Sequence, residues 1–457
     1  MAEPKAKRAP SARELAVRIL AGAEAKKNTV EELMAQALKR HPGLPRVERA
    51  FLLELVQGVK RWQIRLDYFI SRISRLPLEK LPPLALIILR VGAYQLLFLD
   101  KVPNHAAVKE MVELAKARHL PRRHVGFINA VLRRLAEEGP APLPPLNEEP
   151  VRGLSLATAH PPWLVKRWLK RYGPKETLAR LTANNTIPPL TIRVNTLKTT
   201  PAALAARLRE EGVETKPCPY SPVGLHITSL QTPPQDLASY REGLWLFQDE
   251  AAQLVSYLVP LRPGMRVLEI GAGRGGKTTH LAERLANRGL IAAVDYHRRR
   301  LKELSLTLKR WGVTAAWPLR ADAFRRLPFK AGSFDAVIID APCSALGIIR
   351  RHPEIKTRLE ARDLTTFPPR QRAMLRAAAP LVRPGGHLLY ITCTTEPAEN
   401  EAVVETFLQD HPGFRLVFDP MLLPPRARLF VVSPGYFKTS PADHNLDAFF
   451  AALLVKE

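Results

Sequence analysis

Two of the three cysteines in this chain lie where strands of a parallel sheet are expected to end. Cys343 follows the apolar run 336–339 and Asp340, and Cys393 directly follows the run 387–392. Ligands and reacting groups gather beyond the carboxyl ends of strands in an open α/β sheet, so we expect both thiols in one crevice. Because a thiolate is a strong nucleophile, the pair predicts covalent catalysis. The alternative is two ordinary buried cysteines, but their matching positions beside Asp340 favour the catalytic interpretation.

A glycine-rich loop lies between a predicted strand, 266–270, and a predicted helix, 277–286. Glycine permits a tight turn and lets a ligand approach the backbone closely. The loop satisfies the G-x-G-x-x-G pattern of dinucleotide-binding enzymes. It also satisfies an acidic-x-G-x-G-x-G pattern, which resembles the S-adenosylmethionine loop of Rossmann-like methyltransferases. The candidate cofactor contacts in this loop are Glu269, Gly271, Ala272, Gly273, Gly275, Gly276 and Lys277.

Two aspartates at the ends of the next strands extend the predicted cofactor site. Asp295 ends the predicted strand 290–295, where a carboxylate can accept both ribose hydroxyls. Asp322 follows the third strand and is placed to meet an adenine amino group. A helix cap or a turn residue is the alternative for either aspartate. A hydride-transfer enzyme would not need two thiols at neighbouring strand ends, so the cysteines favour a methyltransferase over a nicotinamide oxidoreductase.

The charge of the chain indicates a polyanionic partner. Of its 457 residues, 69 are Lys or Arg and 43 are Asp or Glu, which gives a net charge of +26. Residues 1–140 hold 26 basic and 14 acidic residues, so positive charge is concentrated in the first third of the chain. Contacts with phosphates release counterions and favour binding, so we expect this part to touch nucleic acid. A generally basic soluble protein is the alternative.

The length and pattern predict several domains in a cytoplasmic protein. Three cysteines fit a reducing compartment, and we find neither a signal peptide nor an apolar run long enough to span a membrane. The predicted parts are an all-α domain, a proline-rich linker, an α+β subdomain and an α/β domain of alternating strands and helices. They cover residues 1–138, 139–151, 152–246 and 247–457, respectively.

Several separate segments, taken in order, resemble the Nop/Sun RNA cytosine-5 methyltransferases. The matching segments are 193–198, 248–253, 275–278, 340–344, 350–353, 392–393 and 399–401. The helical front end, through 104–108 and 129–134, resembles a NusB-type RNA-binding bundle. The resemblance implies an α/β Rossmann-like class I methyltransferase with a seven-stranded doubly wound sheet and a small α+β RNA-binding subdomain, preceded by an all-α NusB-like bundle. It also implies 16S ribosomal RNA as the substrate, with transfer RNA as the alternative.

The resemblance implies a role for each matching residue. Cys393 would be the nucleophile that adds to cytosine C6, Asp340 would activate the base, and Cys343 would assist product release. S-adenosylmethionine would be the methyl donor, no metal would be needed, and the protein would act as a monomer. A nearby positive group, for which Lys277 is the candidate, should lower the pKa of Cys393. The expected RNA contacts are Arg193, Asn195, Arg350, Arg351 and His352. For residues 350–352 the alternative is a solvated basic loop. For Arg193 the alternative is a charge at a strand end, and for Asn195 it is a turn residue.

The sequence departs from the family pattern in the cofactor loop. Gly273-Arg274 stands where the family usually has Ala-Pro. If Arg274 blocked the cofactor site, the chain would be a catalytically silent RNA-binding or ribosome-assembly factor.

Overall fold

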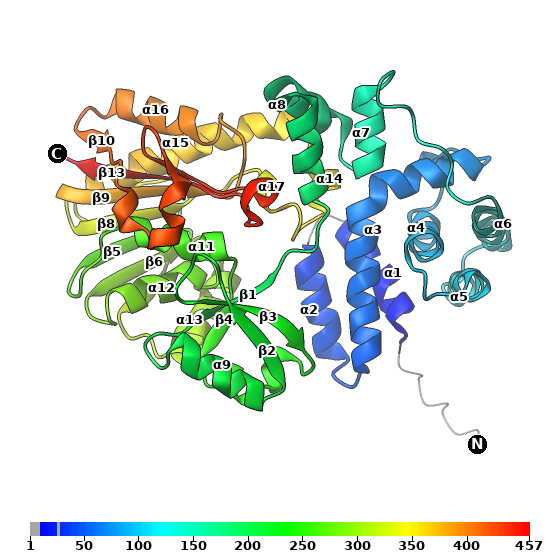
Figure 1. The fold of residues 1–457 in the computed structure, drawn as a ribbon, viewed down its shortest axis with the longest axis horizontal. Helices are drawn as coiled ribbons and strands as arrows, with labels where there is room; N and C mark the ends of the chain where they lie inside the picture. Colours follow the sequence, from blue (N-terminus) through cyan, green and yellow to red (C-terminus); the bar gives the residue numbers. More distant parts are fainter. Residues whose placement is uncertain (1–9, 25–27) are drawn as a thin grey trace. The chain divides into compact units, whose positions relative to one another are not determined.

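The computed structural model describes residues 10–24 and 28–457 as two compact units. The first unit runs to Asn185 and also includes His352–Ala361, and the second contains Thr186–Arg351 and Arg362–Glu457. Figure 1 shows the helices between residues 12 and 183 of the first unit in blue to green and the large sheet of the second unit in green to red. No helix in the described ranges has the length and apolarity needed to cross a membrane.

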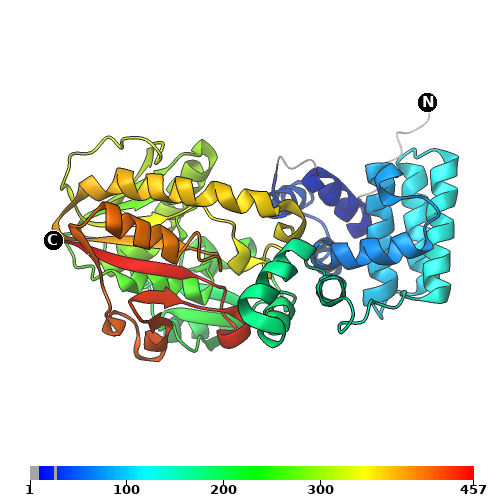
Figure 2. The same cartoon turned by 90° about the horizontal axis from the view of Figure 1, so that it is seen from above.

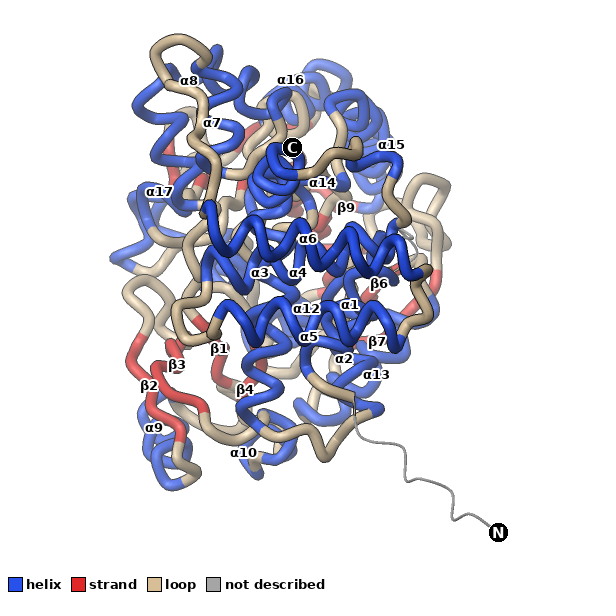
Figure 3. Tube along the Cα trace, turned by 90° about the vertical axis from the view of Figure 1, so that its right-hand side faces the viewer, coloured by secondary structure: helices blue, strands red, loops and turns tan. Residues whose placement is uncertain are grey.

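The described part of the first unit is built from helices, as the sequence predicts for its front end. α4 is buried over most of its length, because apolar residues surround it on nearly all sides. α5 and α6 pack against each other, and Figure 3 shows them side by side. The helices are α1 (Ala12–Glu24), α2 (Val30–Arg40), α3 (Arg46–Ile73), α4 (Pro83–Phe98), α5 (Asn104–Ala117), α6 (Arg122–Glu138), α7 (Pro150–Thr158), α8 (Pro162–Ala183) and α14 (Ile355–Arg358).

The first unit extends beyond the predicted linker at 139–151. α7 packs against α3, and the chain stays with this unit to Asn185. α14, from a distant part of the sequence, joins it through Lys356, which is 2% exposed. The Lys356 ammonium donates hydrogen bonds to the carbonyl oxygen of Arg61 at 3.1 Å and to Oδ1 of Asn185 at 2.5 Å. The compact units therefore divide the chain differently from the predicted domain boundaries, because long-range packing brings 352–361 into the helical unit.

The second unit begins with a small antiparallel sheet in the order β2-β3-β1-β4. Its apolar residues form a core of their own with α9. The elements are β1 (Leu190–Val194), α9 (Pro201–Glu210), β2 (Val213–Pro217), β3 (Gly224–Leu230), β4 (Trp245–Phe247) and the following helix α11 (Glu250–Leu254).

A nine-stranded sheet forms the rest of the second unit, in the order β11-β12-β13-β9-β8-β5-β6-β7, with β10 paired to β13. The five strands from β7 to β9 are parallel, and β13 runs antiparallel to β9. We expected seven strands; in the described part of the chain the two short strands β10 and β11 are added to these seven. The strands are β5 (Arg266–Ile270), β6 (Leu290–Asp295), β7 (Ala316–Arg320), β8 (Phe334–Asp340), β9 (Val382–Thr392), β10 (Phe414–Leu416), β11 (Val431–Val432), β12 (Tyr436–Lys438) and β13 (Phe450–Lys456).

Alternating residues of the parallel strands face two separate cores. Val267 and Ile338 belong to the core with α12 (Gly276–Arg284) and α13 (Arg298–Trp311). Leu268 and Val337 belong to the core with α15 (Phe367–Ala378) and α16 (Glu401–Asp410), two helices that lie side by side in Figure 2. Helices on both faces of a parallel sheet make the predicted doubly wound arrangement.

Candidate active site

The structure brings the two predicted catalytic thiols together. β8 and β9 are parallel neighbours, and their ends are joined by a hydrogen bond from the Ala341 amide to the Ile391 carbonyl at 2.9 Å. Cys343 Sγ lies 3.4 Å from Cys393 Sγ, and both residues are partly exposed. Two sulfur atoms at adjacent strand ends can act on the same atom of a bound ligand.

Asp340 and Lys277 form an ion pair beside the thiols. The Lys277 ammonium lies 2.7 Å from Oδ2 of Asp340, whose side chain is 32% exposed. Burial alone would lower the pKa of Lys277, but attraction to Asp340, with smaller contributions from Glu269 and Cys393, raises it above its usual value. Lys277 is therefore a fixed positive charge next to the cysteines.

The pKa of Cys393 is shifted in the direction opposite to our expectation. The hydrogen bond with Cys343 and burial raise the pKa of the Cys393 thiol well above its usual value, and Asp340 adds to this effect. Lys277 lowers the pKa, as expected, but it is outweighed. The thiol is protonated in this state, because two sulfur groups and a carboxylate share a small space.

The glycine loop after β5 has a backbone that only glycine adopts readily. Gly271 has a φ of +85°, and a Cβ there would lie 2.5 Å from the Asp340 carbonyl oxygen. Gly275 has a φ of +90°, and a Cβ would lie 2.6 Å from Leu304. At Gly276 a Cβ would meet nothing closer than Gln248 Nε2 at 3.7 Å, which is an ordinary contact. The loop is thus tightly packed at Gly271 and Gly275 and less tightly packed at Gly276.

Glu269 fits a role in cofactor binding. It is 1% exposed, and its Oε2 atom has no hydrogen-bond partner among the described residues. Burial raises the pKa of this carboxyl group to about 7. A buried carboxylate oxygen without a donor is costly, so a ligand that donates a hydrogen bond there would stabilise it. The unsatisfied acceptor of Glu269, next to the glycine loop, therefore suits a nucleoside ligand whose hydroxyl or amino groups can donate hydrogen bonds.

The remaining predicted cofactor contacts have partners within the protein. The Ala272 amide donates to Val294 of β6, and Asp295 accepts from the amides of Gly273 at 3.0 Å and His297 at 2.8 Å. A carboxylate oxygen can accept more than one hydrogen bond, so Asp295 keeps capacity for a ligand. Asp322 accepts from the Phe324 amide, which is the turn role given as the alternative.

A set of polar side chains behind the thiols was not found by sequence reasoning. Glu399 is 0% exposed, and its Oε2 accepts from the Ser344 amide at 2.8 Å and from the Gln371 side chain at 3.1 Å. The Ser344 hydroxyl lies 2.6 Å from the hydroxyl of Thr394. Ser344 follows Cys343 and Thr394 follows Cys393, so this network fixes both cysteine loops. The segment 399–401 in the family resemblance was the only sequence signal.

The predicted RNA contacts at 350–352 are mostly engaged inside the protein. Arg350 is 1% exposed and donates to Asp447 Oδ1 at 2.7 Å. Arg351 binds both Asp447 and Asp249, at 2.5 and 2.6 Å. Burial would lower the pKa of Arg351, but the two carboxylates raise it. The prediction for Arg350 is corrected, because a buried guanidinium with carboxylate partners is not presented to RNA; Arg351 and His352 are partly exposed, and their roles stay predictions.

Arg193 and Asn195 are also internal, so their predicted RNA contacts are corrected. Arg193 is fully buried and donates to Gly276 and Thr279 at the start of α12 and to Glu283 at 3.1 Å. Asn195 is fully buried and donates to two backbone carbonyl groups. Arg193 holds the helix that follows the glycine loop, which is a positioning role.

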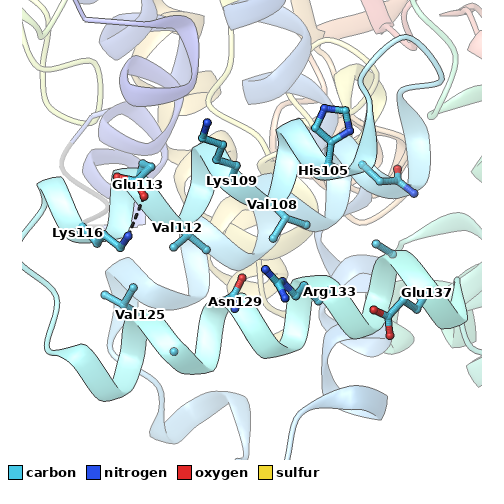
Figure 4. A pocket seen from close by; sticks show the side chains of 13 residues that line it. His105, Val108, Lys109, Val112, Glu113, Lys116, Val125, Asn129, Arg133 and Glu137 are labelled. Atoms are coloured by element: carbon cyan, nitrogen blue, oxygen red, sulfur yellow. Dashed lines mark hydrogen bonds and ion pairs between the residues drawn. The ribbon is translucent and has the colours of Figure 1, made fainter.

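A groove of about 860 Å³ lies on the helical unit between α5 and α6 (Figure 4). Val108, Val112 and Val125 contribute apolar surface, and Lys109 and Arg133 are among its basic residues. Glu113 in the groove is paired with Lys116. The groove combines apolar and basic groups on the part of the chain that is richest in positive charge.

Comparisons with known proteins agree with this arrangement. Family models match at residues 10–137 (NusB family), 160–232 (ferredoxin-like domain of RsmF/B-like methyltransferases) and 256–455 (16S rRNA methyltransferase RsmB/F). A relative from Synechocystis sp., "Probable ribosomal RNA small subunit methyltransferase B", is 36% identical over 98% of this chain and 99% of its own. The Pseudomonas putida "Ribosomal RNA small subunit methyltransferase B" is 36% identical over 90% of this chain and 91% of its own.

A solved structure has a similar fold. The crystal structure of PH0851 covers 99% of this chain and 100% of its own, with a TM-score of 0.84 and 29% identity. The predicted family and fold class are confirmed: a NusB-type helical part, a ferredoxin-like subdomain and a Rossmann-like methyltransferase sheet. The chain belongs to the 16S rRNA methyltransferase RsmB/F family.

Proposed function

We propose that this protein methylates C5 of a cytosine in 16S ribosomal RNA through a covalent bond between Cys393 and C6 of the base. The observation that carries the proposal is the 3.4 Å separation of Cys343 Sγ and Cys393 Sγ beside Asp340. The family is one of 16S rRNA methyltransferases, which supports the substrate class. S-adenosylmethionine supplies the methyl group when bound, and Glu269, the glycine loop and Asp295 would hold it.

The residues of the chain divide the chemistry between them. The Cys393 thiolate adds to C6, and this addition makes C5 nucleophilic. A proton shared between the Asp340 carboxyl group and N3 stabilises the negative charge that the addition places on the ring. After C5 is methylated, a base takes its proton, the electron pair of the C5–H bond restores the C5–C6 double bond, and Cys393 leaves C6 as the thiolate. Cys343 assists this last step as an acid or a base, help that typically contributes roughly 10²–10⁴-fold.

The target base must leave its stack, because two thiols and a methyl donor cannot reach it inside a helix. The basic first unit, with Lys109 and Arg133 in its groove, supports binding of the RNA around that base. Arg274 forms an ion pair with Glu303 of α13 at 2.8 Å. This pairing argues against the silent RNA-binding alternative, which needs Arg274 to block the cofactor loop.

Two cysteine variants test the proposal. Purified wild type, Cys393→Ala and Cys343→Ala are incubated with 16S RNA and S-adenosylmethionine, and methylation is read by bisulfite sequencing and adduct formation by denaturing electrophoresis. Cys393→Ala should give neither product nor adduct. Cys343→Ala should accumulate the adduct, because release fails. Reversed behaviour would contradict the roles, and full activity of Cys393→Ala would contradict the covalent mechanism.

A further inference from the structure

The third cysteine lies in a cluster that the proposed reaction does not use. Cys218 follows β2, His226 is in β3, and Glu250 is the first residue of α11. One potential ligand atom from each residue lies within 4.8 Å of the other two. The three residues come from separate elements of the second unit, so the fold itself brings together a thiol, an imidazole and a carboxyl group.

The carboxyl group of Glu250 has one satisfied oxygen and one unsatisfied oxygen. Oε1 accepts from the backbone amides of Tyr220 and Ser221 at 2.5 and 2.6 Å, which fixes its orientation. Oε2 is buried without a hydrogen-bond partner among the described residues, and it lies 3.8 Å from Nε2 of His226. That distance is too long for a hydrogen bond. Glu250 is 0% exposed, so bulk solvent does not reach this oxygen.

The backbone around Cys218 is shaped to hold its sulfur atom. The Cys218 amide donates to the Gly224 carbonyl at 3.0 Å, which closes the loop between β2 and β3. A Cβ at Gly224 would lie 2.7 Å from Cys218 Sγ, so only glycine leaves room for the thiol in this position. Cys218 is 9% exposed, and the side chain of His226 is 13% exposed.

We propose that Cys218, His226 and Glu250 bind a zinc ion. Sulfur, imidazole nitrogen and carboxylate oxygen are the ligands that Zn²⁺ takes in proteins, whereas Mg²⁺ and Ca²⁺ prefer oxygen alone. A thiolate, a carboxylate and a neutral imidazole carry two negative charges, so the loaded site is neutral, as a buried site requires. Ligand atoms of a tetrahedral site lie roughly 3–4 Å apart, so the side chains move by about 1 Å. Water at the partly exposed side of His226 completes the four ligands.

Zinc binding would join the small sheet to the catalytic part of the second unit. Cys218 and His226 belong to the β2–β3 hairpin, and Glu250 follows Gln248 and Asp249. Gln248 accepts a hydrogen bond from Arg193, and Asp249 binds Arg351. The ion would therefore tie the hairpin to the residues that support the active site.

Cobalt substitution tests the site on the full-length protein. The purified chain is stripped with a chelator and titrated with Zn²⁺ and with Co²⁺, whose bond to a thiolate gives a charge-transfer absorption. Wild type should bind one Zn²⁺ and show the band, and Zn²⁺ should raise its Tm. Cys218→Ala should lose the band. Its Zn²⁺ affinity should fall by at least ~10–100-fold, which is the typical loss when a residue that only supports a metal ligand is removed.

Two further variants keep the test decisive. His226→Gln removes a ligand without touching a thiol, so it should weaken Zn²⁺ binding even if Cys218→Ala folds poorly. Cys343→Ala removes a thiol outside the cluster and should keep the band. No stoichiometric Zn²⁺ binding by wild type would overturn the proposal. A band that survives in Cys218→Ala but disappears in Cys343→Ala would do so too, by placing the metal at the catalytic thiols.

Discussion

The glycine loop after β5 and the two cysteine loops after β8 and β9 lie at the same edge of the sheet but are held by different means. In the glycine loop the backbone decides the shape: Gly271 and Gly275 have positive φ values, and a Cβ at either would collide with a neighbour. In the cysteine loops side chains decide it: Glu399 and Gln371, distant in sequence from Cys343, tie the loops together. A substitution in the first should act through steric strain, and one in the second through lost hydrogen bonds.

The largest loss of stability is expected at Gly271, which tests most directly whether the backbone determines the shape of the glycine loop. Gly271→Ala places a Cβ 2.5 Å from the Asp340 carbonyl oxygen at a φ of +85°. Strain and overpacking together should lower the free energy of unfolding by about 4 kcal/mol and abolish S-adenosylmethionine binding. Denaturant unfolding and calorimetric titration measure the two effects. The matched control is Gly276→Ala, because its Cβ would make only an ordinary contact at 3.7 Å and should change stability by less than about 1 kcal/mol. Equal losses in both variants would contradict the backbone explanation.

The pH dependence of stability tests the burial of Glu269, which lies next to the glycine loop. Burial raises the pKa of Glu269 to about 7, whereas the unfolded chain has the ordinary value of 4.5. Because the folded pKa is raised, its contribution to stability is fully present below pH 4.5 and is lost as the pH rises to about 7. Relative to Glu269→Gln, wild type should therefore lose about 3 kcal/mol of unfolding free energy across this window and then level off. Parallel pH curves for the two proteins would refute this shift.

In the cysteine loops, Glu399→Ala should leave the Ser344 amide and the Gln371 side chain without their acceptor. We expect a loss of about 2 kcal/mol in unfolding free energy, together with slower formation of the Cys393–RNA adduct. Glu399→Gln keeps the shape and one carbonyl oxygen, so it should behave closer to wild type. If both variants form adduct at the wild-type rate, the network is not what positions the thiols.

The smallest effect concerns Lys277 and the pH dependence of methylation. The raised pKa of Cys393 means that the rate should increase with pH as its thiolate forms. Lys277 lowers this pKa, so Lys277→Met should move the pH–rate profile upward by about one unit. Arg274→Gln is the control, because Arg274 pairs with Glu303 instead. A uniform drop in rate without a shifted profile would assign Lys277 to positioning alone.

Features of the fold that depend on short stretches of sequence were predicted correctly. Strands β5 and β6 match the predicted ranges, because short apolar runs between glycine- and aspartate-containing turns define them. The meeting of Cys343 and Cys393 followed from the rule that parallel strands end at one edge of a sheet. The all-α prediction for the front end agrees with helices α1 to α6.

The parts that the sequence did not predict depend on partners far away along the chain. A basic pair such as Arg350–Arg351 looks like an RNA contact until Asp447 is found beside it, and nothing in the local pattern indicates that pairing. The same holds for Arg193 with Glu283. The raised pKa of Cys393 was missed because it depends on the exact position of a second sulfur atom, not on the presence of a lysine.

The placement of α14 has a practical consequence for separating the two halves of the protein. The chain leaves one compact unit and enters the other after Asn185, after Arg351 and again after Ala361, so no single cut divides them. A fragment that starts at Thr186 would retain Lys356 but lack Arg61 and Thr158, whose carbonyl groups receive its ammonium protons. Burial holds the pKa of Lys356 well below its usual value, and exposure of the side chain in the fragment would bring the pKa back toward that value. Workable dissection therefore requires excising residues 352–361 and bridging the gap.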